Sequence, residues 1–497
     1  MPEPLASSTA SLRRAETARP AMAPLPLWVD ALVVLWLGVV LMTPFPQPGR
    51  YLAGDPLRYA AIAKSTLARG DWLELHLGPQ PYFNKPPLLF WITMAAFRLF
   101  GESTFVAQST GAIFGLGMLV ATWALGCRLG DRRHGLLAAL SLATTYVFLK
   151  NAAALRFDAA VALCVMGGIA TVWAGRKRPA WLPLFWVTVA IAVAFKGLAG
   201  VLALPVLIVW SLLRRDLHPW NSWRFWSTLL LVPLPVLPWV LHNLHLHPES
   251  FTSVWYHDNV ELNLEIDRGN PPFVKFAQDL FLSYEGLPWV PFLLHGCFLA
   301  ARALWRGSRE DRWTLPVAWI VGILAPLLCL SSAFSRYVIP LLPASAFLVA
   351  TSLLTLWPRL VGRALYAGLG LLLLAVSVAV AVAGEQLVTD RTPDVVRFSP
   401  WLAEHAPDAP LVQLGGRVSD ALQASSVFYL DREIERLTSE ELPARLATRP
   451  AVPAILIHTD AQHPSEDLAA GIRSEVVVEG LDFDLVLFTP APLPSGG

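Results

Sequence analysis

The chain has 497 residues, of which 55% are hydrophobic and only 15% are charged, and its mean hydropathy is +0.51. An average soluble protein carries about 25% charged residues, so this composition excludes a soluble enzyme, a disordered chain and a nucleic-acid-binding domain. The net charge of +1 hides a division: residues 1–384 carry 30 Lys and Arg against 19 Asp and Glu, whereas residues 385–497 carry 8 against 18. The two parts are therefore expected to lie in different environments.

Residues 1–24 are polar and are expected to form a disordered cytoplasmic N-terminus. From residue 25 to residue 384, apolar stretches recur that approach the length of about 20 residues needed to span a bilayer. They predict an all-α polytopic membrane protein with about 11–13 transmembrane helices. The candidate spans are 27–44, 105–127, 134–152, 158–175, 181–195, 198–213, 225–243, 284–304, 314–331, 337–356 and 361–383.

The basic residues of the short loops predict the orientation. Lys and Arg gather in every second loop, as expected for loops on the cytoplasmic side of a membrane. This alternation places the N-terminus in the cytoplasm and residues 385–497 outside it. The basic residues are Arg13, Arg14, Arg19, Arg128, Arg132, Arg133, Arg176, Lys177, Arg178, Arg214, Arg215, Arg224, Arg302, Arg306, Arg309, Arg312, Arg359 and Arg363.

Residues 45–104 form the first of two long polar segments on the outer face, where loops of this length usually carry function. Within it, Pro56–Arg69 has apolar residues at helical spacing, which predicts a short amphipathic helix at the membrane interface. Asp55 precedes Pro56 and fits an N-cap position. Two interpretations stay open for Asp55: a helix cap, or a carboxylate that binds or activates a substrate.

Lys85 precedes two prolines, Pro86 and Pro87, which force an extended backbone before them and permit a helix after them. The lysine is thus presented at a helix start near the membrane surface. It could be a snorkelling anchor, or it could neutralise a phosphate. The apolar run Leu88–Phe100 is too short to span and is expected to lie flat or to re-enter.

Several motifs, in order along residues 27–360, resemble the lipid A aminoarabinose transferases and their relatives in the protein O-mannosyltransferase superfamily of GT-C glycosyltransferases. The motifs are Asp55-x-x-Arg58-Tyr59-Ala60, Gly70-Asp71-Trp72, Tyr82-Phe83-x-Lys85-Pro86-Pro87, Leu99-Phe100-Gly101, Leu155-Arg156-Phe157-Asp158, Ala194-Phe195-Lys196-Gly197 and Ser335-Arg336-Tyr337-Val338-Ile339-Pro340-Leu341-Leu342-Pro343.

The resemblance implies a GT-C membrane enzyme that takes a sugar from a polyprenyl-phosphate donor. The enzyme would transfer the sugar, with inversion, to an acceptor on the non-cytoplasmic side. It also implies that Asp55 is the principal acidic residue, Asp158 a second one, and Lys85 a lysine near the donor phosphate. Two departures stand out. Pro56 replaces an acidic residue of the mannosyltransferases, and Asn84 replaces a glutamate that belongs to a metal site in the family. A divalent metal is therefore doubtful as a cofactor.

The chemistry of that reaction asks for cations, because the leaving polyprenyl phosphate is already negative. Basic residues fall at predicted outer helix ends, where positive charge is otherwise avoided. With Tyr59, we expect them to bind the donor phosphate: Lys85, Arg58, Arg156, Lys196 and Arg336. A carboxylate near the anomeric carbon suits a base or an orienting group, so Asp55 and Asp158 are the predicted catalytic residues. Arg156 and Asp158 are two residues apart and are not expected to share a helical face, and Asp158 could be an ordinary N-cap.

Residues 244–283 form the second long outer segment and are expected to close over the donor sugar. We expect Tyr82, His257 and Asn259 to contact substrate. His257 and Asp258 are weak candidates for metal ligands, because no HExxH motif is present. His245-Leu246-His247 is interpreted as an interfacial helix end.

Residues 385–497 are predicted to form a small periplasmic α/β accessory domain with a mainly parallel sheet. Short apolar runs indicate strands at Leu411–Leu414, Val427–Leu430, Ala454–Ile457, Val476–Val478 and Leu485–Phe488, with helices near 396–406, 417–425 and 438–448.

Together these features predict a polyprenyl-phosphate-sugar-dependent glycosyltransferase in a bacterial inner membrane, acting on lipid A or on another envelope glycan or protein. The donor would be an undecaprenyl-phosphate sugar. A transporter or flippase of a polyprenyl-linked glycan is the alternative. It predicts inverted repeats or paired broken helices, and it leaves the long first outer segment unexplained.

Overall fold

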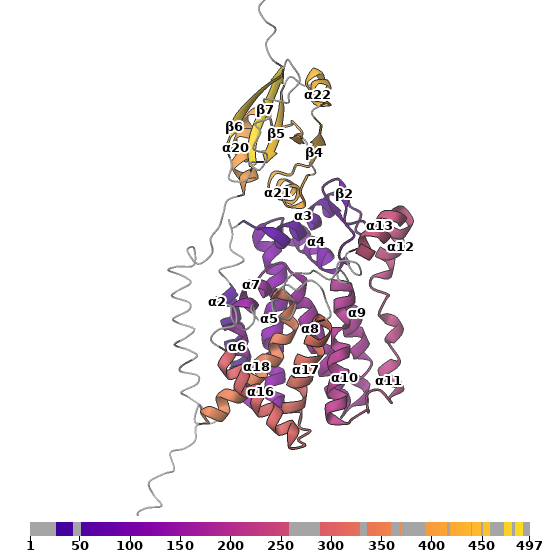
Figure 1. Cartoon of the computed structure of the whole chain (residues 1–497), viewed down its shortest axis with the longest axis vertical. Coiled ribbons are helices and arrows are strands. Elements are labelled where there is room, and N and C mark those ends of the chain that lie inside the picture. The colour runs from indigo at the N-terminus through magenta and orange to yellow at the C-terminus, as the bar shows by residue number, and fades with distance from the viewer. Residues whose placement is uncertain are drawn as a thin grey trace, which may run out of the picture.

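The computed structural model describes residues 26–42, 51–257, 289–328, 335–358, 368, 371 and 393–490, except 415–417, 439, 449–450, 458–471 and 480–482. A bundle of mostly upright helices forms one end of the molecule, and a small sheet with its helices forms the other (Figure 1). The bundle helices are α2 (Leu27–Met42), α5 (Thr104–Leu129), α6 (Arg132–Ala143), α7 (Tyr146–Ala152), α8 (Phe157–Gly175), α9 (Leu184–Lys196), α10 (Ala203–Arg214), α16 (Val290–Trp305), α17 (Asp311–Leu327) and α18 (Leu342–Leu356).

Four helical stretches in the described part of the chain are long and apolar enough to cross a membrane: Thr104–Leu129, Phe157–Gly175, Pro179–Arg214 and Arg336–Leu356. A fifth forms if α6 and α7, which meet at a 71° bend, are one broken span. The chain is thus a multi-pass, mainly helical membrane protein, as predicted. Close packing of the bundle depends on small residues, as at Gly111 of α5, where an added Cβ would lie 2.0 Å from the carbonyl oxygen of Ala154.

Some predicted spans take a different form. The two candidates 181–195 and 198–213 belong to a single helical stretch, which begins with the 3-10 helix η1 (Pro179–Trp181) and joins α9 to α10 through the 3-10 helix η2 (Gly197–Leu202). The candidate 225–243 is not one helix but α11 (Trp223–Trp226), η3 (Leu229–Leu231) and α12 (Leu237–Leu246). Prolines at 233, 235 and 238 interrupt it, because proline removes a backbone donor and clashes with the preceding turn. The candidate 361–383 lies outside the described residues, apart from 368 and 371. Residues 1–24 lie outside them as well.

The outer segments gather at the end of the bundle that faces the sheet (Figure 1). The first contains α3 (Gly54–Arg69), the hairpin β1 (His76–Leu77) and β2 (Gln80–Pro81), and α4 (Leu88–Phe100). The second begins with α13 (Pro248–Tyr256), which follows α12. As predicted, α4 is too short to span, and it packs against α3 with Leu89, Phe90 and Met94 buried.

The C-terminal region contains a five-stranded sheet in the order β4-β3-β5-β7-β6. Its elements are α20 (Asp394–His405), β3 (Leu411–Leu414), α21 (Asp420–Leu430), β4 (Ile434–Leu437), α22 (Leu442–Thr448), β5 (Val452–Ile457), β6 (Ile472–Val478) and β7 (Phe483–Pro490). The α/β class is as predicted, but the mainly parallel sheet is wrong. β3 pairs in parallel with β4 and β5, whereas β7 pairs antiparallel with β5 and β6. Only a short connection separates β6 from β7, and neighbours so joined form a hairpin.

The predicted strand Val427–Leu430 is wrong as well, because these residues end α21. Ser419 caps that helix by accepting a hydrogen bond from Leu422 N at 3.2 Å. Leu422, Val427 and Phe428 are buried along α21, so apolar residues that look like a short strand belong instead to a helical face.

α21 also joins the C-terminal region to the first outer segment, where it packs on α3. Ala424, Val427 and Phe428 belong to the same apolar core as the helical bundle. Salt bridges border this contact: Lys64 Nζ lies 2.5 Å from Asp431 Oδ1, and Arg69 Nη2 lies 3.0 Å from Glu433 Oε1. The C-terminal region therefore rests directly on the helix that carries Asp55.

Candidate active site

Asp55 lies in the first turn of α3, and its carboxylate faces arginines from three parts of the chain. Its oxygens lie 2.9 Å from Arg58 Nη2, 3.5 Å from Arg156 Nη1 and 3.4 Å from Arg336 Nη2. The alternative that Asp55 caps the helix is wrong, since Ala53 is the N-cap residue and no side chain caps that end. The chain enters the helix one residue before Asp55, so the carboxylate is directed to the arginines and not to the backbone.

The start of α8 supplies the second acidic residue. Asp158 Oδ1 accepts a hydrogen bond from Lys196 Nζ at 2.5 Å, and only 6% of the Asp158 side chain is exposed. Asp158 does not cap α8 either, because the N-cap residue is Arg156 and no side-chain cap is formed. Arg156 is extended, at φ −141° and ψ 153°. Arg156 and Asp158 therefore do not share a helical face, since Arg156 lies outside the helix, yet both line one pocket.

Lys196 is the last residue of α9, and the backbone turns sharply after it at Gly197, which has φ +57°. Its ammonium nitrogen lies 4.7 Å from the centre of the Tyr337 ring, and the Arg336 guanidinium carbon lies 5.6 Å from the same ring. Tyr337 therefore presents an aromatic face to two cations, which is a favourable arrangement.

Lys85 reaches the same place from the first outer segment. It stands between the buried Phe83 and the Pro86-Pro87 pair that precedes α4, and its ammonium group donates a hydrogen bond to the Asn84 carbonyl oxygen at 3.1 Å. The helix after the prolines is confirmed, since α4 begins at Leu88. The extended backbone expected before them is wrong, because the chain bends at Asn84 and Lys85.

These side chains enclose one small polar pocket of about 280 Å³, partly open to solvent. Its lining residues are Asp55, Tyr59, Lys85, Arg156, Phe157, Asp158, Lys196, Arg336 and Tyr337. Four lining side chains are cationic and two are carboxylates, which leaves a formal charge of +2. A pocket with this excess, set in partly desolvated surroundings, favours a phosphate group.

Tyr59 forms the aromatic floor of this pocket. Its ring packs edge-on against Phe157 and Phe90, with ring centres 4.9 and 5.8 Å apart. Burial, assisted by the negative charge of Asp55, raises the pKa of Tyr59 to about 12. Its hydroxyl is therefore a proton donor and not a phenolate at neutral pH.

Three predicted residues that the structure describes, Arg58, Tyr82 and His257, lie outside the lining. Arg58 contributes through its ion pair with Asp55. Tyr82 is buried and packs edge-on against Phe90, at 5.7 Å between ring centres. His257 is exposed at the end of α13 and does not line the pocket. Asp258 and Asn259 lie outside the described residues.

Two lining residues, Phe157 and Tyr337, were not among the predicted site residues. Both stand inside sequence motifs, directly beside Arg156, Asp158 and Arg336. Their position next to charged motif residues could have marked them as site residues. The sequence alone, however, does not show whether such an aromatic side chain lines a pocket or packs in the core.

The metal site that the resemblance implies does not fit this chain. Position 84 offers an amide and not a carboxylate, and His257, the predicted histidine ligand, is exposed at the end of α13. Among the described residues, the group able to hold a metal ion is instead Asp71, Glu74 and His242.

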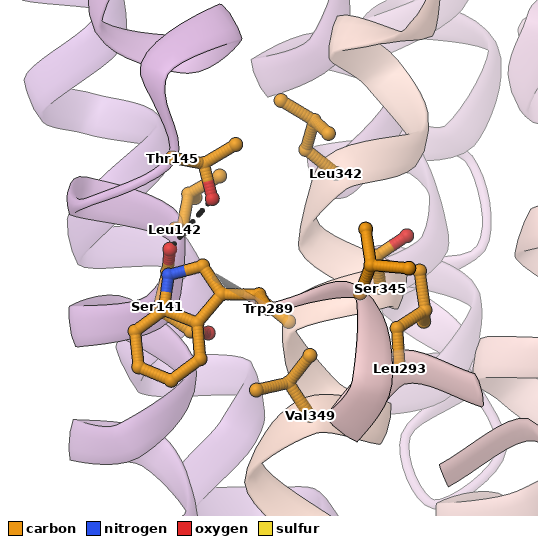
Figure 2. A pocket seen from close by; sticks show the side chains of 10 residues that line it. Ser141, Leu142, Thr145, Trp289, Leu293, Leu342, Ser345 and Val349 are labelled. Atoms are coloured by element: carbon orange, nitrogen blue, oxygen red, sulfur yellow. Dashed lines mark hydrogen bonds between the residues drawn. The ribbon is translucent and has the colours of Figure 1, made fainter. Parts of the chain in front are cut away.

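A second pocket of about 420 Å³ lies between α6 on one side and α16 and α18 on the other (Figure 2). The Trp289 indole lies beside Ser141, and its nitrogen donates a hydrogen bond to Thr144 Oγ1 at 3.0 Å. None of its lining side chains is charged. It therefore lacks the groups for acid–base or phosphate chemistry, which the Asp55 pocket provides.

Known proteins resemble this chain in sequence. The model of the dolichyl-phosphate-mannose-protein mannosyltransferase family matches residues 84–242. An undecaprenyl phosphate-alpha-4-amino-4-deoxy-L-arabinose arabinosyl transferase of Sodalis glossinidius is 30% identical over 349 residues, which are 65% of this chain and 58% of that protein. An uncharacterized protein of Aquifex aeolicus is 26% identical over 59% of this chain and 57% of its own length. The chain thus matches less than two thirds of the length of these relatives.

Solved structures resemble the chain over more of its length. The crystal structure of ArnT from Cupriavidus metallidurans bound to undecaprenyl phosphate matches with a TM-score of 0.70 and 21% identity, over 93% of this chain and 97% of that one. An Archaeoglobus fulgidus oligosaccharyltransferase matches with a TM-score of 0.53 and 14% identity, over 82% of this chain and 64% of that one. The resemblance indicated by the sequence motifs is thereby confirmed: the chain has the GT-C fold and is ArnT-like in both sequence and architecture.

Proposed function

We propose that the chain is an integral-membrane glycosyltransferase that takes a sugar from a polyprenyl-phosphate donor. The observation that carries this proposal is the Asp55 pocket, where a carboxylate and an excess of cations meet in one small cavity. The relatives are named as transferases that use undecaprenyl phosphate-linked aminoarabinose, and a similar structure contains undecaprenyl phosphate. Both facts support the donor class.

The charges of the pocket residues suggest which of them act on the donor and which on the acceptor. When the bond between the anomeric carbon and the phosphate oxygen breaks, the departing phosphate gains negative charge. Arg156, Arg336 and Lys85 would stabilise that charge, because preorganised cations in a partly desolvated pocket act most strongly on charge that develops during the reaction. No proton is needed on the leaving group.

Asp55 would act on the acceptor. A carboxylate held at the pocket can accept the proton of an incoming hydroxyl or orient it toward the anomeric carbon. Its contacts with Arg58, Arg156 and Arg336 fix its position. Asp158, held by Lys196, would position the lysine near the phosphate. Attack from the face opposite the phosphate inverts the anomeric carbon.

The site would lie on the non-cytoplasmic side of a bacterial inner membrane, with the N-terminus cytoplasmic and residues 385–497 periplasmic. The alternation of basic loops supports this orientation. The acceptor would be lipid A or another envelope glycan or protein. None of the relatives and solved structures described above is named as a transporter, so the comparisons do not support the transporter alternative.

The experiment that tests the proposal identifies the lipids that co-purify with the protein in mild detergent, by mass spectrometry. We expect a polyprenyl phosphate, or its sugar conjugate, in the wild type and its loss in Lys85→Ala. The matched control is Lys64→Ala, which removes a cation of the same outer segment that pairs with Asp431 and does not line the pocket. No polyprenyl lipid in the wild type, or equal loss in both variants, contradicts the proposal.

A further inference from the structure

Three potential metal ligands converge about α12, outside the pocket described above. Asp71, Glu74 and His242 each offer a ligand atom, and these atoms all lie within 4.8 Å of one another. Asp71 follows α3, Glu74 precedes β1, and His242 lies on α12. The cluster therefore joins the first outer segment to the helix that leads into the second.

Local hydrogen bonds aim the carboxylates into this cluster. Asp71 Oδ1 accepts a hydrogen bond from Leu73 N at 2.8 Å, which leaves Oδ2 on the side of His242, 3.3 Å from its Nε2. Glu74 Oε1 lies 2.6 Å from His247 Nε2 and 3.3 Å from His76 Nε2. Histidine contacts of this kind commonly orient the carboxylates that bind a metal.

The hydrogen bonding of His242 is the strongest indication of a bound cation. Its Nε2 is shielded from solvent and, in the described part of the chain, makes no hydrogen bond even though Asp71 Oδ2 is near. A buried ring nitrogen without a partner is costly. Two ligand atoms at metal-bond lengths and a tetrahedral angle lie roughly 3.4 Å apart, which is close to the separation found here. A cation between them would satisfy both groups.

The frame of the cluster is rigid. Asn243, next to His242, is fully buried, and its side-chain nitrogen donates to the carbonyl oxygens of Leu73 at 2.8 Å and Trp239 at 2.7 Å. Trp239 is buried with Phe83 and Phe251 in a small apolar core against which Leu73 packs. Trp239 and Asn243 of the helix that carries His242, and Leu73 of the segment that carries Asp71 and Glu74, are thus held by buried contacts before any ion binds, which favours binding.

We infer that Asp71, Glu74 and His242 bind a divalent transition-metal ion, with zinc as the best match, and that His247 and His76 orient Glu74. One imidazole and two carboxylates form a mixed nitrogen and oxygen set that zinc accepts readily, with a fourth position left for water. The ion would tie the first outer segment to α12. This site uses none of the side chains of the Asp55 pocket and does not include position 84, so it does not depend on the proposed transfer reaction.

Metal analysis of the full chain tests this inference. The protein is purified in detergent, stripped with a chelator, dialysed, and titrated with zinc against a coloured competing chelator, and the bound metal is counted by plasma mass spectrometry. We expect one zinc per chain, an affinity at least about 100-fold weaker in Asp71→Asn and Glu74→Gln, and no stable zinc in His242→Ala. X-ray absorption at the zinc edge should show nitrogen and oxygen ligands with an imidazole contribution and no sulfur.

Matched controls lie on the same elements. His245→Ala removes an exposed histidine of α12, and Glu249→Gln removes an exposed carboxylate of α13. Both should bind zinc like the wild type. Because His242→Ala could fail to fold, Asp71→Asn, which keeps the shape of a side chain that is 45% exposed, carries the test in that case. No zinc in the wild type, or equal affinity in the Asp71→Asn and His245→Ala proteins, overturns the inference.

Discussion

The two ends of α8 each carry a cluster of arginine and aspartate side chains, but the charge balance of the clusters differs. At the C-terminal end, Arg176 and Arg214 pair with Asp216 and Asp311, so two cations meet two carboxylates. Trp173 also donates a hydrogen bond to Asp311 at 3.1 Å. At the N-terminal end, the Asp55 pocket holds four cations and two carboxylates.

This difference separates a structural network from a binding site. In the balanced cluster each charge offsets another, and the pairs fix α8 against α10 and α17. In the pocket, the surplus of positive charge has a desolvation cost that a bound anion would offset. Ion pairs alone therefore do not identify a site in this protein, whereas an excess of one sign does.

The largest effect should come from the central carboxylates of the two clusters. Asp55→Asn should lower transfer activity by about 100-fold or more, since general-base residues contribute on that scale. Asp311→Asn should leave turnover near normal. It leaves Arg176 and Arg214 with Asp216 as the one remaining carboxylate of their cluster, and it should destabilise the fold by about 3 kcal/mol at most.

The two measurements are sugar transfer from labelled membrane lipid and the thermal unfolding midpoint in detergent. If Asp311→Asn lost activity while keeping its unfolding midpoint, the comparison between the two ends of α8 would be wrong.

A smaller effect should distinguish charge from geometry at the pocket. Arg336→Ala should weaken polyprenyl-phosphate binding by about 10- to 100-fold, because hydrogen bonds to charged groups are worth about 1.5–3 kcal/mol. Arg336→Lys keeps the charge and should recover part of the loss. Binding is measured by titrating the lipid into purified protein in micelles. Equal weakening in both variants would show that the planar guanidinium, and not the charge, is required.

The Tyr59 hydroxyl should contribute less again. Tyr59→Phe should lower activity by about 10-fold or less, as expected for one neutral hydrogen bond. Because the pKa of Tyr59 is raised to about 12, the hydroxyl keeps its proton up to a pH well above its usual range. The pH profile below about pH 10 should therefore have the same shape in the wild type and in Tyr59→Phe. A limb near pH 10 that vanishes in the variant would contradict the raised pKa.

The smallest effect is expected where α3 meets the C-terminal region. Lys64→Gln removes the ion pair with Asp431, whose side chain is 75% exposed. Such pairs contribute about 1 kcal/mol or less and are screened by salt. The unfolding midpoint should therefore change little, and activity should be retained. A large loss of activity would show that the packing of the C-terminal region on α3 affects the geometry of the pocket.

Much of the site could be predicted from the sequence. Asp55, Lys85 and Arg336 fall in motifs or at outer helix ends, and lysine or arginine on that side of a membrane protein needs a reason to be there. What the spacing did not show was the local geometry. Asp55 fits an N-cap position in sequence, yet the helix begins one residue before it, and Arg156 lies outside the helix that Asp158 opens.

The membrane class, the α/β character of the C-terminal region and most of the pocket residues could be predicted from the sequence, because hydrophobic length and charge are local properties of the chain. Which charged side chains meet depends on the packing of distant segments. Asp55 contacts Arg58, Arg156 and Arg336, and His242 contacts Asp71. Helix breaks and pairing direction also depended on packing, since prolines, short connections and buried faces act only once neighbouring elements are in place.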